Sequence, residues 1–142
     1  MNDHCSCVEL AHLPIVKMQD VLLARFLGRD LAAKLGFAPA ALTRIATAIS
    51  EITRNVVQHA GAAGEIQISQ LTQADQSGLR ITVTDSGKGM EHSEHLLEEC
   101  GLSAIGAGLP GARRLADQFQ INTAAGAGTT VTMDFWIAPA KG

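Results

Sequence analysis

The sequence predicts a two-layer α/β (α+β) sandwich, in which helices cover one face of a mixed, mostly antiparallel sheet. Apolar residues recur at helical spacing near the start of the chain, whereas later segments alternate apolar and polar residues as strands do. The chain has 142 residues, of which 46% are hydrophobic and 18% charged, and this suits a folded domain rather than a disordered chain. We therefore expect residues 1–142 to form a single domain, with residues 1–7 as a flexible terminus.

The first strand and the first helix follow from this pattern. The apolar segment Val8–Val16 contains Pro14, which suits an edge strand because proline cannot donate a ladder hydrogen bond. Gln19–Leu35 carries apolar residues at helical spacing, and Gly36 follows as a typical helix stop. The chain is therefore expected to begin with a strand at the edge of the sheet, or with an extended entry segment, and to continue into a helix.

A second helix is expected to begin at Pro39 and to end at Gly61. Proline suits the first turn of a helix, where its missing N–H would have no partner in any case. The segment carries a stripe of apolar side chains for the core, namely Leu42, Ile45, Ala46, Ile49, Ile52 and Val56. This stripe should pack on the sheet.

Two strands are expected after the second helix. Glu65–Leu71 and Leu79–Thr84 have the apolar pattern of strands, and the polar segment Asp75–Gly78 between them is expected to be a turn. The glycine-rich segment that follows contains Glu91–Cys100, for which we expect a short helix.

The last part of the chain is expected to contain a third helix and a closing hairpin. Gly111–Phe119 suits a helix. Ile121–Ala125 and Thr129–Ile137 resemble strands on either side of the glycine-containing segment Gly126–Gly128. These elements complete the predicted sandwich.

Composition and charge exclude several classes of protein. The formal net charge is −3, aromatic residues make up 4%, and the basic residues form no run, so nucleic acid is not the expected partner. No apolar run is long enough to span a bilayer, and the N-terminus lacks the features of a signal peptide. Cys5, Cys7 and Cys100 fit no disulfide framework, so we expect a cytoplasmic protein in a reducing environment. Cys5 and Cys7 lie near His4 and His12 but fit no zinc framework.

Glu51 and Asn55 form the first candidate site motif. Residues four positions apart share one face of a helix, and both lie beside the apolar stripe, where they would face the rim of a pocket. The carboxamide oxygen of Asn55 is a ligand that suits Mg²⁺, and the carboxylate of Glu51 can act as a general base. For this motif alone, a solvated pair on a helix surface is the alternative.

Asp85 leaves an apolar strand and is followed by glycines at alternate positions, Gly87 and Gly89. Its carboxylate can accept a hydrogen bond from the exocyclic amine of adenine, and the glycines let the backbone approach a planar base. Thr129 opens the last strand, and its hydroxyl can reach a water or a ring nitrogen of the base. The alternatives are an Asx-type turn at Asp85 and ordinary strand propensity at Thr129.

The segment Gly106–Gly111 matches the pattern G-x-G-x-x-G, but a dinucleotide fingerprint requires a strand directly before it. Here a loop or a short helix is expected instead. The small residues around Gly106 and Gly108 expose backbone N–H groups at the start of the third helix, and such a helix start binds phosphate oxygens. A plain glycine-rich loop is the alternative.

Together these segments resemble the GHKL ATPases, which have the Bergerat nucleotide-binding fold. Glu51–Asn55 resembles the N box of that superfamily, Asp85–Gly89 its G1 box, and Gly106–Gly108 its G2 box. Within the superfamily the chain looks closest to anti-sigma-factor-type serine/threonine kinases, and nearest to the RsbT-type switch kinases of stressosome modules. The resemblance extends from about Leu23 to Thr130, and the Leu-Pro-Gly sequence after the G2 glycines is its most specific part.

The resemblance implies a function, cofactors and partners. It implies ATP with Mg²⁺, and phosphorylation of a serine or threonine on a STAS-domain antagonist protein. It also implies partner switching in a stress or sigma-factor pathway, in which the kinase alternates between the STAS protein and a downstream phosphatase, regulator or sigma factor. Neither nucleic acid nor a membrane is expected as a partner.

The resemblance also implies roles for individual residues. Glu51 would be the general base, Asn55 would be the Mg²⁺ ligand, and Asp85 would hold adenine. The other positions would line the base (Gly87 and Gly89), shape the phosphate lid (Gly106, Gly108 and Leu109) or complete the adenine contacts (Thr129).

Two other functions remain open. One is an anti-sigma factor that sequesters a sigma factor, and the other is a non-catalytic, nucleotide-gated binding adaptor. Glu51 and Asn55 argue against an inactive adaptor, and the Gly-Leu-Pro-Gly sequence of the lid favours the kinase over the sigma binder. Lys88 departs from the pattern, because many relatives have proline there, and it adds a charge near the nucleotide.

Overall fold

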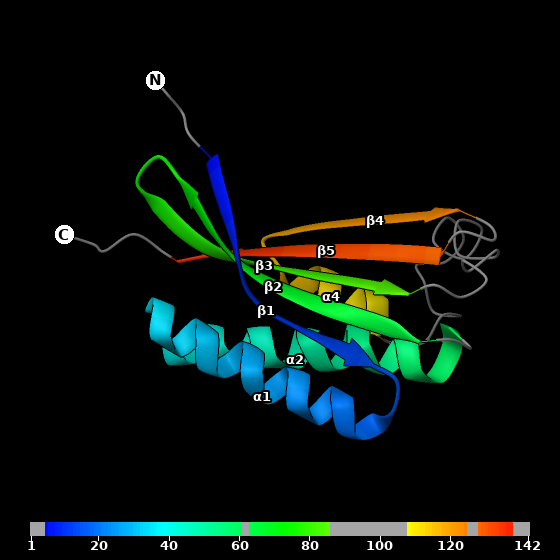
Figure 1. Cartoon of the computed structure of the whole chain (residues 1–142). Helices are drawn as coiled ribbons and strands as arrows, with labels where there is room; N and C mark the ends of the chain where they lie inside the picture. The colour runs from blue at the N-terminus through cyan, green and yellow to red at the C-terminus, as the bar shows by residue number, and fades with distance from the viewer. Residues whose placement is uncertain (1–4, 61–62, 86–107, 125–127, 138–142) are drawn as a thin grey trace.

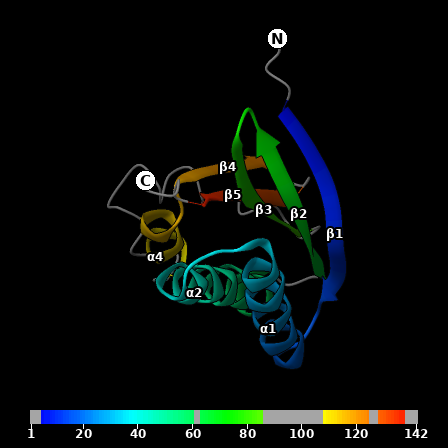
Figure 2. The same ribbon diagram turned by 90° about the vertical axis from the view of Figure 1, so that its left-hand side faces the viewer.

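The computed structural model describes residues 5–60, 63–85, 108–124 and 128–137, which form two layers (Figure 1). Five strands make one sheet in the order β1-β2-β3-β5-β4, and every strand pairing is antiparallel among the described residues. The helices lie together on one face of this sheet (Figure 2). The predicted fold class is therefore confirmed. The strands are β1 (Cys5–Ile15), β2 (Gly64–Gln73), β3 (Gln76–Asp85), β4 (Gln118–Ala124) and β5 (Gly128–Trp136), and the helical segments are α1 (Met18–Leu35), α2 (Pro39–Asn55), the π-helical turn η1 (Val56–Ala60) and α4 (Gly108–Leu115).

The core lies between the sheet and the helices. Ile68, Ile81 and Met133 are register partners on three neighbouring strands, and all three are fully buried. Side chains alternate between the two faces of a strand, so the intervening residues of β3, such as Arg80 and Thr82, lie on the opposite face. This second face carries no helix of the described part of the chain (Figure 2).

Strand β1 forms one edge of the sheet, as predicted. It begins at Cys5, however, so the expected flexible terminus over residues 1–7 is wrong for its last three residues. Cys7 pairs with Leu71, the last residue of the predicted second strand, and Cys5 pairs with Gln73, because β2 extends two residues beyond its predicted end. Residues 1–4 lie outside the described residues.

Helix α1 ends at Leu35, as predicted. Gly36 has a φ of 106°, the left-handed conformation of a helix C-cap, and its N–H donates to the carbonyl oxygens of the last turn. At the other end, the carboxylate of Asp20 accepts hydrogen bonds from the backbone N–H groups of Val16 (2.8 Å) and Lys17 (3.0 Å). These bonds lower the pKa of Asp20, because they favour its charged form.

All six residues of the predicted core stripe are buried; five lie in helix α2, and Val56 is the first residue of η1. The predicted extent to Gly61 needs correction. The α-helix ends at Asn55 and continues as the π-helical turn η1 to Ala60, while Gly61 lies outside the described residues. Near this end the buried hydroxyl of Thr53 donates to the carbonyl oxygen of Ile49 at 2.7 Å. A π-helical turn within a helix is uncommon and is frequently found at functional sites.

The turn between β2 and β3 is shorter than predicted. It consists of Ala74 and Asp75, and Ala74 has a φ of 54°. Gln76–Gly78 belongs to β3 instead. Gly78 is needed for space rather than for a turn, because a Cβ there would lie 2.5 Å from the carbonyl oxygen of Phe135 and 2.8 Å from the ring of Trp136.

The predicted third helix, Gly111–Phe119, also needs correction. Helix α4 begins at Gly108 and ends at Leu115, and Phe119 lies in β4, where it pairs with Met133. Phe119 and Ile121 alternate with glutamines, which is the period of a strand. Asp117 fixes the corner between helix and strand, because its carboxylate accepts a hydrogen bond from the backbone N–H of Trp136 at 2.7 Å. The helix expected over Glu91–Cys100 lies outside the described residues.

Large exposed apolar side chains gather in the N-terminal part of the described chain. In the described part of the chain they belong to β1, to the β1–α1 link and to the first half of α1, where Phe26 is 70% exposed. No helix in the described residues has both the length and the apolar character needed to cross a membrane.

Candidate nucleotide-binding site

Glu51 and Asn55 lie on one face of α2, as their spacing predicted. Both are partly buried, and both lie off the core stripe that faces the sheet. The carboxylate of Glu51 forms an ion pair with Arg54 at 3.6 Å. Asn55 is the last residue of the α-helix, directly before η1. Glu51 and Asn55 therefore stand together at the end of α2.

Asp85 is the last residue of β3, and it is only 7% exposed. Its register partner on β5 is Thr129, which is 4% exposed, and its partner on β2 is Gly64. Asp85 and Thr129 are 44 positions apart in the sequence but opposite each other in the sheet. Asp85 and Thr129, which were each predicted to contact adenine, are thus brought side by side by the strand pairing.

Gly64 joins this end of the sheet to the end of α2. A Cβ at Gly64 would lie 2.8 Å from Cγ1 of Val56, the first residue of η1, and 3.4 Å from Cα of Asp85. Since Val56 follows Asn55 directly, the two predicted motifs approach each other at Gly64. The sequence interpretation missed this residue. A glycine at the start of a strand was its only signal.

A cavity of about 320 Å³ opens at this place. It is lined by Ala63, Gly64, Glu65, Thr84 and Asp85. The volume is within the range of small-molecule sites. A predicted site residue therefore lines a cavity of suitable size.

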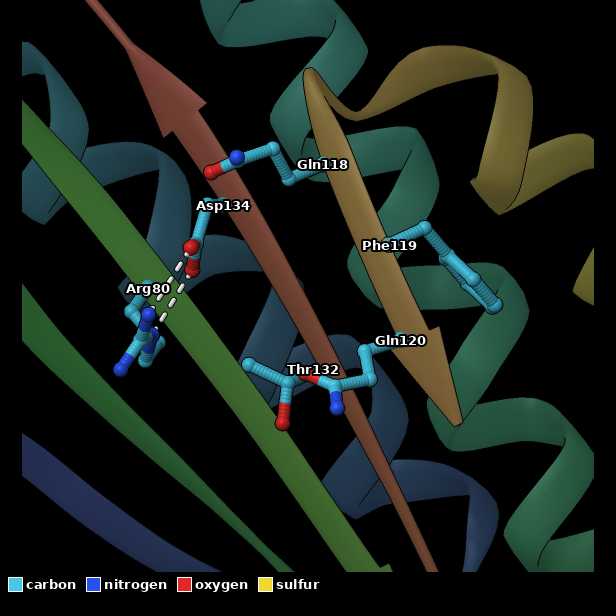
Figure 3. Close-up of a pocket in the computed structure, with 6 residues that line it drawn as sticks. All are labelled: Arg80, Gln118, Phe119, Gln120, Thr132 and Asp134. Atoms are coloured by element: carbon cyan, nitrogen blue, oxygen red, sulfur yellow. Dashed lines mark hydrogen bonds and ion pairs between the residues drawn. The ribbon is translucent and has the colours of Figure 1, made fainter. Parts of the chain in front are cut away.

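A second cavity, of about 450 Å³, lies at β3, β4 and β5 and contains none of the predicted site residues (Figure 3). Arg80 and Asp134 point toward each other within it, with hydrogen bonds of 2.8 Å and 2.9 Å, whereas Phe119 points away from them (Figure 3). The other lining residues are Gln118, Gln120 and Thr132. This cavity is the larger, but its central charges already neutralise each other. We therefore place the candidate site at the Asp85 end.

Five predicted site residues are described only by their backbone or not at all. Gly108 and Leu109 are the first two residues of α4, so that the Gly-Leu-Pro-Gly sequence opens a helix, as the phosphate interpretation requires. Helix α4 packs against α2 (Figure 2). Gly87, Gly89 and Gly106 lie outside the described residues.

The histidine and cysteine residues near the N-terminus show no converging set of ligands in the described residues. His12 forms a hydrogen-bonded ion pair with Glu65 at 3.0 Å, and this partner raises the pKa of His12. Cys7 is exposed. Within the described ranges, no three side chains of the histidine, cysteine, aspartate or glutamate type are grouped as metal ligands.

Comparison with known proteins decides the family. A family model described as a histidine kinase-like ATPase domain matches residues 17–135, which is most of the chain. The chain belongs to this family. It is also 41% identical over 140 residues to the serine/threonine-protein kinase RsbT of Bacillus subtilis (strain 168), and the match covers 96% of this chain and 99% of that protein.

A solved structure supports the fold of this histidine kinase-like ATPase domain. The crystal structure of the RsbU and RsbW domains of a Mycobacterium tuberculosis protein matches with a TM-score of 0.62 and 22% sequence identity. The match covers 93% of this chain and 34% of that longer chain. At this identity the likeness concerns the fold alone.

These findings confirm the resemblance that the N box, G1 box and G2 box motifs predicted. The chain is a serine/threonine-protein kinase relative within an ATPase family, and ATP is the nucleotide that such a domain binds. The roles of individual residues, the metal and the identity of the protein partner stay predictions.

Proposed function

We propose that this protein transfers the γ-phosphoryl group of ATP to a serine or threonine of a STAS-domain antagonist protein and thereby switches between partners. One observation carries the proposal. The pairing of β3 with β5 places Asp85 opposite Thr129, beside a cavity, and Gly64 joins this pair to the end of α2. The residues proposed to contact adenine and the residue proposed to hold the Mg²⁺ ion of the phosphates thus belong to one region of the molecule.

Asp85 is proposed to accept a hydrogen bond from the exocyclic amine of adenine. A carboxylate is an acceptor only, so it suits an amine donor and disfavours the carbonyl oxygen that guanine presents instead. Thr129 is its neighbour across the ladder and can complete the contacts through its hydroxyl. Gly87 and Gly89 are proposed to line the base.

Asn55 is proposed as the protein ligand of Mg²⁺. Its neutral carboxamide oxygen fits this ion, which keeps several waters and usually binds through one or two protein groups plus substrate phosphates. When bound, Mg²⁺ would neutralise charge on the phosphates. The described residues offer no cage of three or more acidic or histidine ligands, and this agrees with an ion held largely by the nucleotide.

Glu51 is proposed as the general base for the acceptor hydroxyl. It lies one helical turn before Asn55, and its pairing with Arg54 at 3.6 Å restricts where the carboxylate can point. Arg54 is partly exposed, so this pair orients the carboxylate more than it stabilises the fold.

The start of α4 is proposed to bind the phosphates. The first N–H groups of a helix have no partner within the helix, and they lie at the positive end of its dipole. Gly108 and Leu109 contribute such groups, and Gly106 precedes them. Since α4 packs against α2, this helix start belongs to the same layer as Asn55.

The proposed protein partner is inferred from the similarity to RsbT. RsbT is named as a serine/threonine-protein kinase, and it matches this chain over nearly its whole length. A STAS-domain antagonist as substrate, and a downstream phosphatase, regulator or sigma factor as the alternate partner, extend that similarity. The cytoplasm is the proposed location.

The test is phosphotransfer from labelled ATP with Mg²⁺ to a purified STAS-domain protein encoded beside this chain. We expect phosphoserine or phosphothreonine on the partner. In Glu51→Ala the rate should fall by about 10²–10⁴-fold, the contribution of a positioned base, while ATP still binds. Wild-type transfer by this variant would refute the role of Glu51. A stable complex with the STAS protein and bound ATP, but no transfer, would instead indicate a nucleotide-gated binding switch.

A further inference from the structure

Gly64 is enclosed on three sides. A Cβ at this position would lie 2.7 Å from the carbonyl oxygen of Thr84, 2.8 Å from Cγ1 of Val56 and 3.4 Å from Cα of Asp85. The first two distances are too short for real contacts, so one of these neighbours would have to move. Neither moves easily, because the first is backbone of a paired strand and the second belongs to a buried, β-branched side chain.

Backbone conformation does not explain the glycine. The described glycines with a positive φ are Gly36 and Gly128, and Gly64 is not among them. An alanine could therefore adopt the backbone angles at position 64. The position excludes a side chain because there is no room for a Cβ atom on the face of β2 that points toward η1.

The neighbours of Gly64 belong to two different parts of the proposed site. Val56 follows Asn55, the proposed metal ligand, and Asp85 is the proposed adenine acceptor and the register partner of Gly64. The missing side chain lets the end of α2 rest directly on the strand pair that carries Asp85. A methyl group here would push these two parts away from each other.

We propose that Gly64 is a positioning residue for nucleotide recognition, which holds Asp85 at the adenine position by allowing Val56 to pack closely on the β2–β3 strand pair beside the end of β3. This inference rests on the proposed adenine role of Asp85. It adds a residue that no motif of the family resemblance included. Gly64 itself touches no reacting atom.

Gly78 supplies a matched control. It is the other crowded glycine of the β2–β3 hairpin, because a Cβ there would lie 2.5 Å from the carbonyl oxygen of Phe135 and 2.8 Å from the ring of Trp136. It lies at the opposite end of β3 from Asp85, about 23 Å away along an extended strand. Gly64→Ala and Gly78→Ala should therefore destabilise the fold to a similar extent, but only the first lies near the site.

The experiment measures the Kd for ATP and for GTP, each with Mg²⁺, together with the thermal midpoint, for the wild type, Gly64→Ala, Gly78→Ala and Asp85→Asn. We expect Gly64→Ala to weaken ATP binding by about 10-fold, the loss of one hydrogen bond to a charged group, and to reduce the ATP-over-GTP preference. Gly78→Ala should keep the wild-type preference. Adding Val56→Ala to Gly64→Ala should restore part of the preference, because it removes the Cγ atoms that the new methyl group would meet.

The outcomes separate this inference from the proposed function. If Asp85→Asn reduces the preference but Gly64→Ala matches Gly78→Ala, the positioning role is overturned and the adenine role stands. If Asp85→Asn has no effect on the preference, the adenine role fails and the inference fails with it. If Gly64→Ala does not fold, Val56→Ile replaces it, because the larger side chain crowds the contact between residues 56 and 64 from the η1 side. An unchanged preference in that variant would overturn the inference.

Discussion

Two buried aspartates lie on the neighbouring strands β3 and β5, and they differ in what surrounds them. Asp134 of β5 is 6% exposed and forms two hydrogen bonds with Arg80, in the middle of β3. Asp85, the last residue of β3, is 7% exposed and lies beside Thr129, Gly64 and a cavity. Burial alone therefore does not identify a functional carboxylate.

The two aspartates lie on opposite faces of the sheet. Asp134 and Arg80 lie on the face of the sheet without described helices, and their charges neutralise each other within the protein. Asp85 lies on the face that carries the helices, at the point where β3 ends and α2 ends. A carboxylate at a strand end, near a helix end and beside a cavity, is placed for a ligand. A carboxylate with a bidentate arginine is placed for stability.

Among effects on nucleotide affinity, the largest is expected at the end of α2 that lies near Asp85. Asn55→Ala should weaken Mg²⁺-dependent ATP binding by roughly 100-fold, the upper range for disturbing a metal site, because the proposed metal ligand is removed. Isothermal titration of ATP with and without Mg²⁺ measures this. An affinity that depends on the metal as in the wild type would contradict the ligand role.

Asp85→Asn is expected to have the next largest effect. The change keeps the shape of the side chain but replaces one acceptor oxygen with a donor, so ATP binding should fall by about 10-fold while GTP binding changes less. Titration with both nucleotides measures the difference. Equal losses for the two would show that Asp85 does not recognise the base.

Asp134→Asn should affect stability and leave nucleotide affinity unchanged. It removes the charge partner of Arg80, and we expect a loss of about 1–2 kcal/mol in the free energy of unfolding, limited by the partial exposure of Arg80. Urea denaturation, with ATP titration of the same sample, checks both parts. A loss of ATP affinity without a loss of stability would show that Asp134 serves nucleotide binding rather than stability, contrary to the comparison with Asp85.

The smallest effect is expected at the exposed pair His12–Glu65 between β1 and β2. Glu65 raises the pKa of His12 in the folded protein. The resulting stabilisation is present below the ordinary histidine pKa of about 6.5, and it is lost as pH rises through the higher folded value. Thermal unfolding across this range should show a slight decrease in stability for the wild type. His12→Gln should lack this decrease, and an identical pH profile for the two proteins would exclude the pair as its source.

Local sequence signals predicted much of the fold and the helix face that Glu51 and Asn55 share. Gly36 ends α1 in a left-handed conformation, and Glu51 and Asn55 share a helix face because four residues span about one turn. Such features depend on neighbours within a few positions. Gly78 and Phe119 were misinterpreted for the opposite reason, since Gly78 is required by residues of β5 and Phe119 obeys the period of a strand that pairs with β5.

The sequence by itself determined the order of the elements, the residue types of the nucleotide motifs and the face of α2 that carries two of them. Tertiary structure alone decided that Thr129 stands opposite Asp85, that Arg80 neutralises Asp134, and that Gly64 must have no side chain. The physical reason is the range of the interactions. Helical and strand periods are set by adjacent residues, whereas register and close approach between distant strands follow from packing the whole core between one sheet and its helices.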